Sequence, residues 1–431
     1  MKILLINALK PYSRNSWLLK TLSKLFLPAD LTLQYIASMT PKEHDVRILD
    51  ESISQVKETD FSDNYDIIGI SCNRTPAALH TYRIADEFRR RGKTVVLGGY
   101  HPSAMPEEAK QHADSVVIGE AELTWPQLLK DFENGKLKPF YRQNRPVDPN
   151  NIPPADHTVG NISSFAASVQ STRGCPIGCE FCSIASQRFG YLYRKRPIRQ
   201  VIEEIASIPQ KFIIFNDSSL SIDLEYIKSL FREMTELNKK FRCWMNINIP
   251  LSNDEFLKLA SEAGCVAIEF GLESISQYTI NTISKRTNKV KLYRDVIRKV
   301  HDYGIAVGGT FVFGFDTDTH NVFDETLRVL PSLDLDFPRF SILTPFPGTP
   351  LFKRLDEEGR IITKDWSQYD MTHVVFQPKQ MTVEELQSGW EKVCNEIYVS
   401  ITLIKRIFAA NNLSMVSWLW RGMANTIEFL K

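Results

Sequence analysis

Several features that define whole classes of protein are missing from this sequence. No window offers about 18 uninterrupted apolar residues, so we predict no membrane span. The first apolar run, of about five residues, is followed by no small-residue cleavage site, which argues against a signal peptide. No repeat with a period of about 20–50 residues is present, which argues against a solenoid. Lys and Arg number 52 and Asp and Glu 51, so no basic excess predicts a nucleic-acid partner.

Cysteine is also scarce, with seven in 431 residues. Without an export signal we expect a cytoplasmic protein, whose cysteines are thiols or metal ligands rather than disulfides. A chain of this length suggests two or three domains and can bury a core without disulfide staples. Core packing is the expected role of the isolated cysteines Cys72, Cys243, Cys265 and Cys394.

The first 135 residues alternate short apolar runs with helical patterns. Continuous apolar runs are typical of parallel strands that are buried on both faces, with crossover helices between them. We therefore predict an α/β domain over residues 1–135 with a doubly wound, Rossmann-like sheet, whose ligands bind beyond the carboxyl ends of the strands. The expected strands are Ile3–Ile6, Val46–Leu49, Ile67–Cys72, Thr94–Leu97 and Ser115–Ile118, and the expected helices are Leu31–Met39, Ala77–Arg91, Pro106–His112 and Glu122–Phe132.

Residues 136–163 are rich in Pro, Asn and Asp and predict a linker over the surface. A second series of βα patterns fills residues 164–380. Its six units predict a partial (β/α)6 barrel, and residues 381–431 predict a helical C-terminal region. The expected barrel strands are Phe165–Ser171, Phe212–Asn216, Arg242–Ile249, Val266–Phe270, Ala306–Phe313 and Arg339–Leu343, and the expected helices are Ile198–Ile208, Leu224–Leu237, Asn253–Glu262, Leu292–Tyr303 and Val322–Leu330.

The most informative motif is C-x3-C-x2-C, formed by Cys175, Cys179 and Cys182 directly after a predicted strand. Gly174 and Gly178 let the loop bend and bring three sulfurs to one point. Three thiolates can hold three corners of a [4Fe–4S] cluster, and with no fourth cysteine nearby the fourth iron stays open to a ligand. The alternatives are a zinc site, which lacks a fourth ligand in this stretch, or three buried thiols.

At these residues the sequence resembles the radical S-adenosylmethionine (SAM) superfamily, whose signature is C-x3-C-x-aromatic-C, with Phe181 in the aromatic place. The resemblance implies that the open iron binds the amino and carboxylate groups of SAM. It also implies that one electron, from an external donor of the flavodoxin or ferredoxin type, cleaves SAM to methionine and a 5′-deoxyadenosyl radical. Spacing alone indicates only an open three-thiolate site.

Further barrel positions match the family less specifically, and the resemblance implies SAM contacts for them. Asp217 follows the second strand, where relatives hold the methionine end of SAM. Glu273 follows the fourth strand, where relatives often place a ribose-binding residue. Lys285 and Arg286 lie where a basic residue can face the SAM carboxylate, and Gly309 and Gly314 bracket the fifth strand near the adenine. The alternative for each is a strand-end cap, a solvated charge or a turn glycine.

A second pattern lies in the N-terminal domain, where two loops follow predicted strands. They resemble the cobalamin-binding domain fused to many radical SAM enzymes, in which these loops read Gly-Gly-x-His-Pro and Gly-Glu-x-Glu. Paired glycines allow the backbone to approach a large ring closely. The alternative is a scaffold that holds no cofactor. The resemblance implies cobalamin contacts at the carboxyl edge of the sheet for Gly98, Gly99, Tyr100, His101, Pro102, Gly119 and Glu120.

One departure from other cobalamin proteins concerns the cobalt ligand. Cobalamin proteins of the mutase type carry D-x-H-x-x-G, whose His ligates cobalt from below. The comparable stretch here, Asp50–Gln55, contains no His. We therefore predict that no His of this loop ligates cobalt.

Other segments leave alternatives open. Leu343–Pro350 resembles the loop after the sixth strand in these relatives, where it reaches the barrel mouth and can touch substrate, or it is a Pro-stiffened turn. The apolar residues within Trp17–Phe26 and Ile397–Trp420 allow two interpretations. They pack on the barrel, or they form an apolar substrate cleft or a helix that contacts a membrane surface. Four residues after the cysteines line the active site or only cover the loop: Tyr191, Tyr193, Arg194 and Arg196.

The best interpretation is a cobalamin-dependent radical SAM enzyme, similar to the class B methyltransferases. By this resemblance, one SAM yields the radical that abstracts hydrogen from an unactivated carbon of a small, apolar substrate, and a second SAM methylates the cobalt. Relatives that form rings, rearrange or oxidise their substrates are the enzymatic alternative, since no residue separates these outcomes. An iron–sulfur or cobalamin sensor is the remaining class, and no helix-turn-helix or basic arm supports it.

Overall fold

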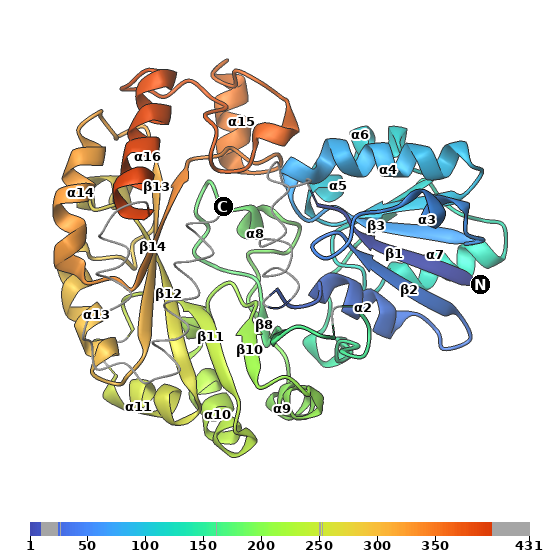
Figure 1. The fold of residues 1–431 in the computed structure, drawn as a ribbon, viewed down its shortest axis with the longest axis horizontal. Coiled ribbons are helices and arrows are strands. Elements are labelled where there is room, and N and C mark those ends of the chain that lie inside the picture. Colours follow the sequence, from blue (N-terminus) through green and yellow to red (C-terminus); the bar gives the residue numbers. More distant parts are fainter. Residues whose placement is uncertain (10–24, 26, 161, 250, 252, 399–431) are drawn as a thin grey trace.

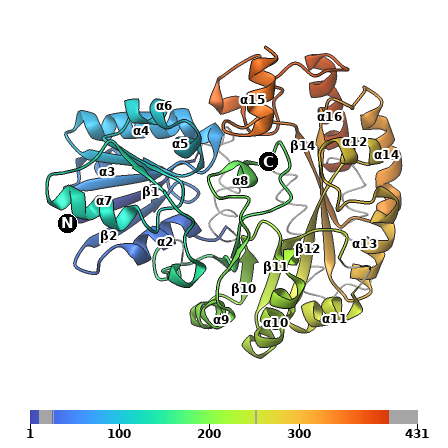
Figure 2. The ribbon, with the colours of Figure 1, turned by 180° about the vertical axis from the view of Figure 1, so that it is seen from behind.

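The computed structural model describes residues 1–9, 25, 27–160, 162–249, 251 and 253–398. Two six-stranded parallel sheets dominate this part of the chain. Figures 1 and 2 show them as two lobes, one blue to cyan and one green to red, which meet in the middle of the molecule. The predicted α/β architecture, with a Rossmann-like domain followed by a partial barrel, is confirmed.

The N-terminal sheet has the strand order β2-β1-β3-β4-β5-β6. The order reverses direction beside β1, which is the topological switch point of a doubly wound sheet. Its apolar runs are continuous because each face is covered: Ile3 and Leu5 pack on one side, and Leu4 and Ile6 on the other. The strands are β1 (Lys2–Asn7), β2 (Asp45–Asp50), β3 (Ile67–Ser71), β4 (Thr94–Gly98), β5 (Ser115–Ile118) and β6 (Phe140–Arg142).

Helices cover both faces of this sheet. Leu33 of α2 and Leu128 of α7 pack on one face, and Tyr82 of α4 packs on the other. Helix α2 begins where it does because the Asp30 carboxylate accepts the backbone N–H of Leu33 at 2.9 Å. The sequence did not predict α3 and α5, whose five residues are too short for a periodic pattern. The helices are α2 (Leu31–Met39), α3 (Glu58–Ser62), α4 (Ala78–Arg90), α5 (Tyr100–Ala104), α6 (Pro106–Gln111) and α7 (Trp125–Glu133).

The segment predicted as a linker contributes more than a connection. Its strand β6 pairs in parallel with β5 and adds a sixth strand to the N-terminal sheet. Further along, Val147 and Ile152 pack against Leu31 and Tyr35 of α2. A strand of three residues, Phe140–Arg142, in a polar stretch gives too little pattern to be predicted.

The second sheet has the order β14-β13-β12-β11-β10-β7, and each neighbouring pair is parallel. Its strands curve around a lumen that Phe212, Ile214 and Phe337 fill at one end, while the opposite faces pack on the outer helices. Strands β7 and β14 are the two edges, so the barrel is open as predicted. The strands are β7 (Ala166–Val169), β10 (Phe212–Phe215), β11 (Lys240–Met245), β12 (Cys265–Glu273), β13 (Ala306–Phe313) and β14 (Phe337–Ile342).

The outer helices follow the expected positions, and a short ribbon and four further helices complete the described part. The two-stranded antiparallel ribbon consists of β8 (Thr172–Arg173) and β9 (Arg194–Lys195). The helices are α8 (Ser183–Ser186), α9 (Ile198–Ser207), α10 (Leu224–Met234), α11 (Asp254–Glu262), α12 (Gln277–Thr282), α13 (Tyr293–His301), α14 (Val322–Leu333), α15 (Pro350–Glu357) and α16 (Val383–Tyr398).

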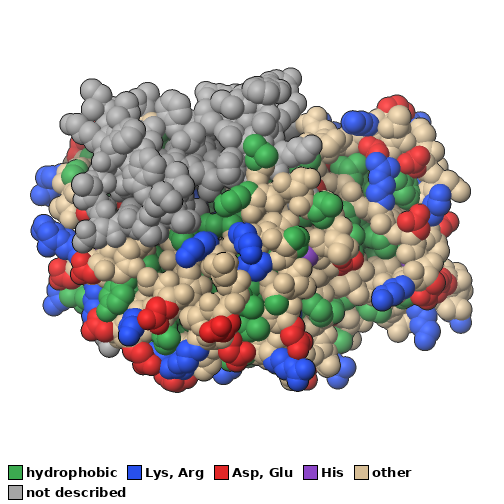
Figure 3. Space-filling view, turned by 60° about the horizontal axis from the view of Figure 1, so that its bottom comes forward, with side chains coloured by type: hydrophobic (Ala, Val, Ile, Leu, Met, Phe, Trp, Pro, Cys, Tyr) green, Lys and Arg blue, Asp and Glu red, His purple; other side chains and the backbone are tan. Residues whose placement is uncertain are grey.

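The last described helix, α16, lies on the outside of the barrel. Trp390 Nε1 donates a hydrogen bond to the Phe340 carbonyl at 3.1 Å. The Tyr398 hydroxyl donates one to the Pro338 carbonyl at 2.7 Å. Most of the predicted apolar terminal segments lie outside the described residues. Within these residues no helix is long and apolar enough to cross a membrane. Figure 3 shows charges of both signs mixed over the exposed face, as the net charge of +1 suggests.

Candidate functional site

The cysteine loop is closed at its base by the β8–β9 ribbon, and both ribbon views place its helix α8 between the two sheets (Figures 1 and 2). The backbone N–H of Cys175 donates to the Gly190 carbonyl at 2.8 Å. Gly174 has a φ of 84°, and a Cβ there would lie 2.1 Å from the Leu192 carbonyl oxygen. Only glycine therefore allows the loop to fold back on itself at this point.

The three thiols lie in one partly buried space. Cys179 is buried, and Cys175 and Cys182 are half-buried. Burial raises the pKa of the Cys179 thiol to about 12, and the other two cysteines also influence it. Iron binding requires thiolates, so loading of the site releases protons. Among the described residues, no three His, Cys, Asp or Glu side chains are arranged around a single metal ion. A [4Fe–4S] cluster places a different requirement on the loop, because each cysteine binds its own iron.

Glu273 and Lys285 form an ion pair beside the cysteines. The register of β12 shifts at Glu273, whose φ of 64° turns its side chain toward Lys285. A Cβ on Gly271 would lie 2.5 Å from both charged groups, so a larger residue here would push the ends of this ion pair aside. Burial lowers the pKa of Lys285, but Glu273 and Cys179 outweigh it and leave the pKa raised. The structure thus brings two predicted SAM contacts together beside the predicted cluster.

Asp217, another predicted SAM contact, lies against the chain that leads into the cysteine loop. Its buried carboxylate accepts hydrogen bonds from the backbone and hydroxyl groups of Ser171 and Thr172, with the two hydroxyls at 2.8 and 2.6 Å. Burial raises the pKa of Asp217 to about 6, against the effect of these donors. The carboxylate therefore joins the end of β10 to the chain that leads into the cysteine loop.

The remaining predicted SAM residues have close protein neighbours. Phe181 packs on the barrel core, with its ring 5.7 Å from that of Phe315. A Cβ on Gly309 would lie 2.8 Å from Leu272, which shows that this glycine faces packed side chains. Gly314 has a φ of 106°, which favours glycine whatever its surroundings.

The loop after β4 is built around contacts within the N-terminal domain. Gly99 has a φ of 100°, and a Cβ there would lie 2.9 Å from the Cys72 carbonyl oxygen. The His101 ring is completely buried, with Nδ1 3.4 Å from the Thr75 hydroxyl and Nε2 3.3 Å from a Glu108 oxygen. Pro102 is also buried. These observations place the backbone of Gly98 and Gly99, rather than the imidazole, at the carboxyl edge of the sheet.

Tyr100 reaches from this loop to the barrel. Its hydroxyl donates to the Pro347 carbonyl at 2.7 Å, within the segment Leu343–Pro350. Burial raises the pKa of Tyr100, and the proximity of Cys182 raises it further. The backbone N–H of Leu351, just past this segment, donates to the Glu180 carbonyl at 3.0 Å. The loop after β14 therefore contacts both the N-terminal domain and the cysteine loop.

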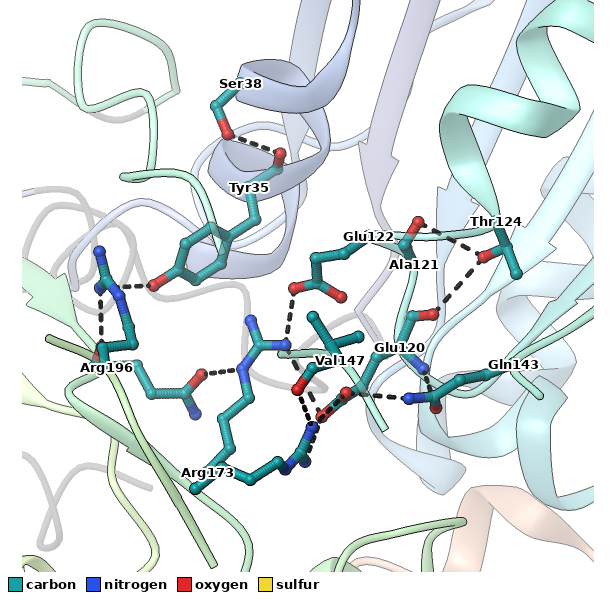
Figure 4. Close-up of polar contacts among 12 residues, drawn as sticks. Tyr35, Ser38, Glu120, Ala121, Glu122, Thr124, Gln143, Val147, Arg173 and Arg196 are labelled. Atoms are coloured by element: carbon teal, nitrogen blue, oxygen red, sulfur yellow. Dashed lines mark hydrogen bonds and ion pairs between the residues drawn. The ribbon is translucent and has the colours of Figure 1, made fainter. Parts of the chain in front are cut away.

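The loop after β5 is joined to the cysteine loop by ion pairs. Gly119 has a φ of 90°, and its Cβ would lie 2.5 Å from the Gln143 amide oxygen. Gln143 in turn holds both the backbone N–H and the carboxylate of Glu120, each at 3.0 Å. Figure 4 shows Arg173 reaching Glu120 and Glu122 from the barrel side. Sequence analysis assigned Glu120 to a cofactor and did not single out Arg173 or Gln143.

The four ambiguous residues after the cysteines separate into different environments. Tyr191 is exposed, and the Tyr193 hydroxyl is buried. Arg194 binds the Glu120 carboxylate through two nitrogens. Arg196 is buried and pairs with Glu204 at 2.6 Å.

A second ion-pair network, which sequence analysis missed, lies on the other side of the cysteine loop. Glu180 of the motif pairs with Arg354 of α15 at 3.0 Å, and Arg354 also binds Asp316 at 2.8 Å. Arg360 pairs with the same Asp316 at 2.7 Å. Their separation in sequence, 174 residues between Glu180 and Arg354, leaves no local pattern that could reveal the contact.

Comparison with known families agrees with this arrangement. The Radical SAM superfamily matches residues 169–330, the B12 binding domain matches residues 25–129, and a domain of unknown function matches residues 349–417. Bacteriochlorophyllide d C-12(1)-methyltransferase of Chlorobaculum tepidum is 31% identical over 95% of this chain and 92% of its own length. The chain belongs to the radical SAM superfamily, in the group whose members carry a B12-binding domain. Bacteriochlorophyllide d C-8(2)-methyltransferase of the same organism is 32% identical over 80% of each chain.

A solved structure has the same fold. The radical SAM methyltransferase TsrM of Kitasatospora setae, with cobalamin and a [4Fe–4S] cluster bound, has a TM-score of 0.66 and 18% identity, and the match covers 83% of this chain and 78% of that one. The matches to the two family domains and to the 31% identical relative confirm the enzyme class and the cofactors expected from the sequence. The protein is a cobalamin-dependent radical SAM methyltransferase that uses a [4Fe–4S] cluster, SAM and cobalamin.

Proposed function

We propose that this enzyme methylates an unactivated side-chain carbon of a chlorophyll-type tetrapyrrole. The observation that carries the proposal is the match, along most of the chain, to two enzymes named for methylation of bacteriochlorophyllide d. A tetrapyrrole is a largely apolar small molecule, which agrees with the substrate class expected from the sequence. An unactivated carbon has no acidic proton for a side-chain base to remove, so cofactors must supply the chemistry.

The cofactors would be held by residues on facing parts of the two sheets. Cys175, Cys179 and Cys182 would hold the cluster, and the Lys285–Glu273 pair beside them would face the polar end of SAM. The backbone at Gly98 and Gly99 would support cobalamin. When bound, the cluster and SAM supply a carbon radical and cobalamin supplies the methyl group. Asp217 would keep the base of the cysteine loop in place.

Two further parts of the proposal concern the surroundings of the enzyme. The cluster needs an external electron donor, for which a flavodoxin or ferredoxin is the expected class. We expect the enzyme to work in the cytoplasm, where its seven cysteines stay reduced.

The test uses the full chain, purified without oxygen and reconstituted with iron, sulfide and hydroxocobalamin. It is incubated with SAM, a strong reductant and bacteriochlorophyllide d as the probe, and the products are separated by mass. We expect a product heavier by one methylene, together with S-adenosylhomocysteine and 5′-deoxyadenosine. A Cys179→Ala variant with the same additions should form none of them.

Two results would overturn the proposal. Formation of 5′-deoxyadenosine with the probe unchanged would exclude bacteriochlorophyllide d as the substrate. A probe that is oxidised or cyclised without gaining a methylene would exclude methylation of this tetrapyrrole.

A further inference from the structure

Four charged residues join the N-terminal domain to the cysteine loop, and we name them the domain clamp: Glu120, Glu122, Arg173 and Arg194. Arg194 binds both oxygens of Glu120, at 2.6 and 2.7 Å. Arg173 lies 2.6 Å from Glu122 and 3.6 Å from Glu120. Figure 4 shows the two glutamates converging on this point from the loop after β5. Two cations from the barrel side therefore meet two anions from the cofactor-binding domain.

The domain clamp is removed from solvent. The side chains of Glu122 and Arg194 are 6% and 10% exposed, and those of Arg173 and Glu120 are 12% and 18% exposed. Burial raises the pKa of Glu120, but Arg194 and Arg173 outweigh it and hold the pKa below its usual value. Burial lowers the pKa of Arg173, but the charges of Glu122 and Glu120 have the larger effect and leave this pKa above its usual value. The domain clamp joins two acidic and two basic side chains, so removal of one leaves an unbalanced charge in a buried place.

The two arginines occupy both ends of the cysteine loop. Arg173 and Arg194 are directly paired in the β8–β9 ribbon, and Cys175 follows Arg173 by two residues. The ring of Tyr35 lies 5.4 Å from the Arg173 guanidinium and covers it from the side of α2. Movement of the ribbon against the N-terminal domain would therefore move the cysteines against the sheet edge.

The glutamates are held equally firmly on their own side. Gln143, next to β6, accepts a hydrogen bond from the backbone N–H of Glu120 and donates one to the Glu120 carboxylate. Ser103 receives the backbone N–H of Gly119 at 3.0 Å and donates to the Gly99 carbonyl at 2.7 Å. The two glycine loops at the carboxyl edge thus form one hydrogen-bonded unit, to which Glu120 belongs.

We propose that the domain clamp sets the position of the cobalamin-binding edge relative to the cluster. Glu120 and Glu122 are then positioning residues that act through Arg173 and Arg194 rather than cofactor contacts. The inference rests on the proposed function, because methyl transfer requires the radical carbon and the methyl donor to meet in one geometry. Misplacement by about 1 Å can lower such a rate about a hundredfold.

The test compares Glu120→Gln with the matched control Glu203→Gln. Glu203 pairs with Arg199 at 2.8 Å on the exposed surface of α9, with side chains 60% and 89% exposed. Each full-length variant is loaded with iron, sulfide and cobalamin and incubated with SAM, a strong reductant and the bacteriochlorophyllide d probe. The metal content, the 5′-deoxyadenosine and the methylated product are measured. We expect normal loading in both and about ten- to a hundredfold less methylated product per 5′-deoxyadenosine in Glu120→Gln.

A second readout does not depend on turnover. The magnetic coupling between the reduced cluster and cob(II)alamin, measured by electron paramagnetic resonance, reports the separation of the two sites. We expect a broader distribution of couplings in Glu120→Gln than in wild type or Glu203→Gln. Arg194→Lys keeps the charge but loses the two-nitrogen contact with Glu120. The width of its coupling distribution should therefore lie between those of wild type and Glu120→Gln.

The outcomes separate the two proposals. An unchanged coupling distribution and product ratio in Glu120→Gln would overturn the domain clamp. Loss of bound cobalamin in Glu120→Gln, with the cluster intact, would instead make Glu120 a cofactor contact and would also overturn it. Failure of wild type to methylate the tetrapyrrole probe would reject the proposed substrate, while the coupling measurement would still decide on the clamp.

Discussion

The two parallel sheets of this protein use the ends of their strands in different ways. At the barrel, reactive groups gather at the mouth, where three cysteines and the Lys285–Glu273 pair lie close together. At the N-terminal sheet, the side chains of the two glycine motifs are taken up by protein contacts. His101 is buried, and Glu120 is paired with Arg194. What remains at that edge is largely backbone.

The difference shows that a motif at a ligand-binding edge need not consist of ligand contacts. A large flat cofactor can rest on backbone where glycines allow close approach. The side chains of the same motif can then hold the surface in shape, as His101 does, or dock it to another domain, as Glu120 does. In the barrel the motif residues are themselves the expected ligands.

The largest expected effect comes from removing one barrel thiol. Cys179→Ala should remove cluster iron and lower SAM cleavage at least about a thousandfold, because no other group of the loop can replace a thiolate. Cobalamin binding should stay near the wild-type level, since its domain is separate. Iron analysis, the visible spectrum and 5′-deoxyadenosine formation measure these effects.

Cys394→Ala is the matched control. Cys394 lies on α16, outside the loop, and this variant should keep its iron and its SAM cleavage. Simultaneous loss of iron and cobalamin in Cys179→Ala would mean that the two sheets do not load independently. That result would contradict the view that the barrel and the N-terminal sheet bind their cofactors separately.

Sequence predicted the regular part of both sheets well, for a physical reason. Strands such as β13 (Ala306–Phe313) are buried on both faces, so each of their residues is apolar or small and the pattern is continuous. The cysteine spacing is equally local. Both kinds of information lie within about ten residues of chain.

The parts that were missed depend on pairs that are distant in sequence. Nothing near Arg173 indicates that Glu122 will meet it, and nothing near Glu180 indicates Arg354. Asp217 was assigned by its place at a strand end, but the direction of its carboxylate depends on packing against Ser171 and Thr172. Strand position could be predicted, whereas the partner of each polar side chain could not.

A smaller effect is expected from Asp217, whose burial raises its pKa from 3.8 to about 6. Between these values the folded chain keeps a proton that the unfolded chain has released. The free energy of unfolding therefore falls as the pH rises through about 4 to 6, by up to about 3 kcal/mol from this group. Asp217→Asn does not titrate, so its free energy of unfolding should show a correspondingly weaker fall.

Urea unfolding of the cluster-free chain across this pH range measures the effect. Asp302→Asn changes an exposed carboxylate directly after α13 and should keep the wild-type slope. Asp217→Ala removes the acceptor altogether and should cost about 1–3 kcal/mol below pH 4, with weaker retention of iron. This cost should become smaller as the pH rises through about 4 to 6, because only the wild type loses stability there. Identical slopes in wild type and Asp217→Asn would contradict the assignment of this titration to Asp217.

The smallest expected effect sharpens the comparison from the N-terminal side. His101 lies edge-on to Trp366, with ring centroids 5.4 Å apart, and contacts Thr75 and Glu108 through its two nitrogens. His101→Asn should lower the free energy of unfolding by about 1–3 kcal/mol, because buried partners lose their hydrogen bonds. The visible and electron paramagnetic resonance spectra of bound cobalamin should stay unchanged, since a ring enclosed by protein cannot ligate cobalt. His112→Asn, with a partly exposed ring, is the control for stability. A cobalt spectrum that changes in His101→Asn but not in His112→Asn would mean that His101 contacts the cofactor directly, as the barrel cysteines are expected to do.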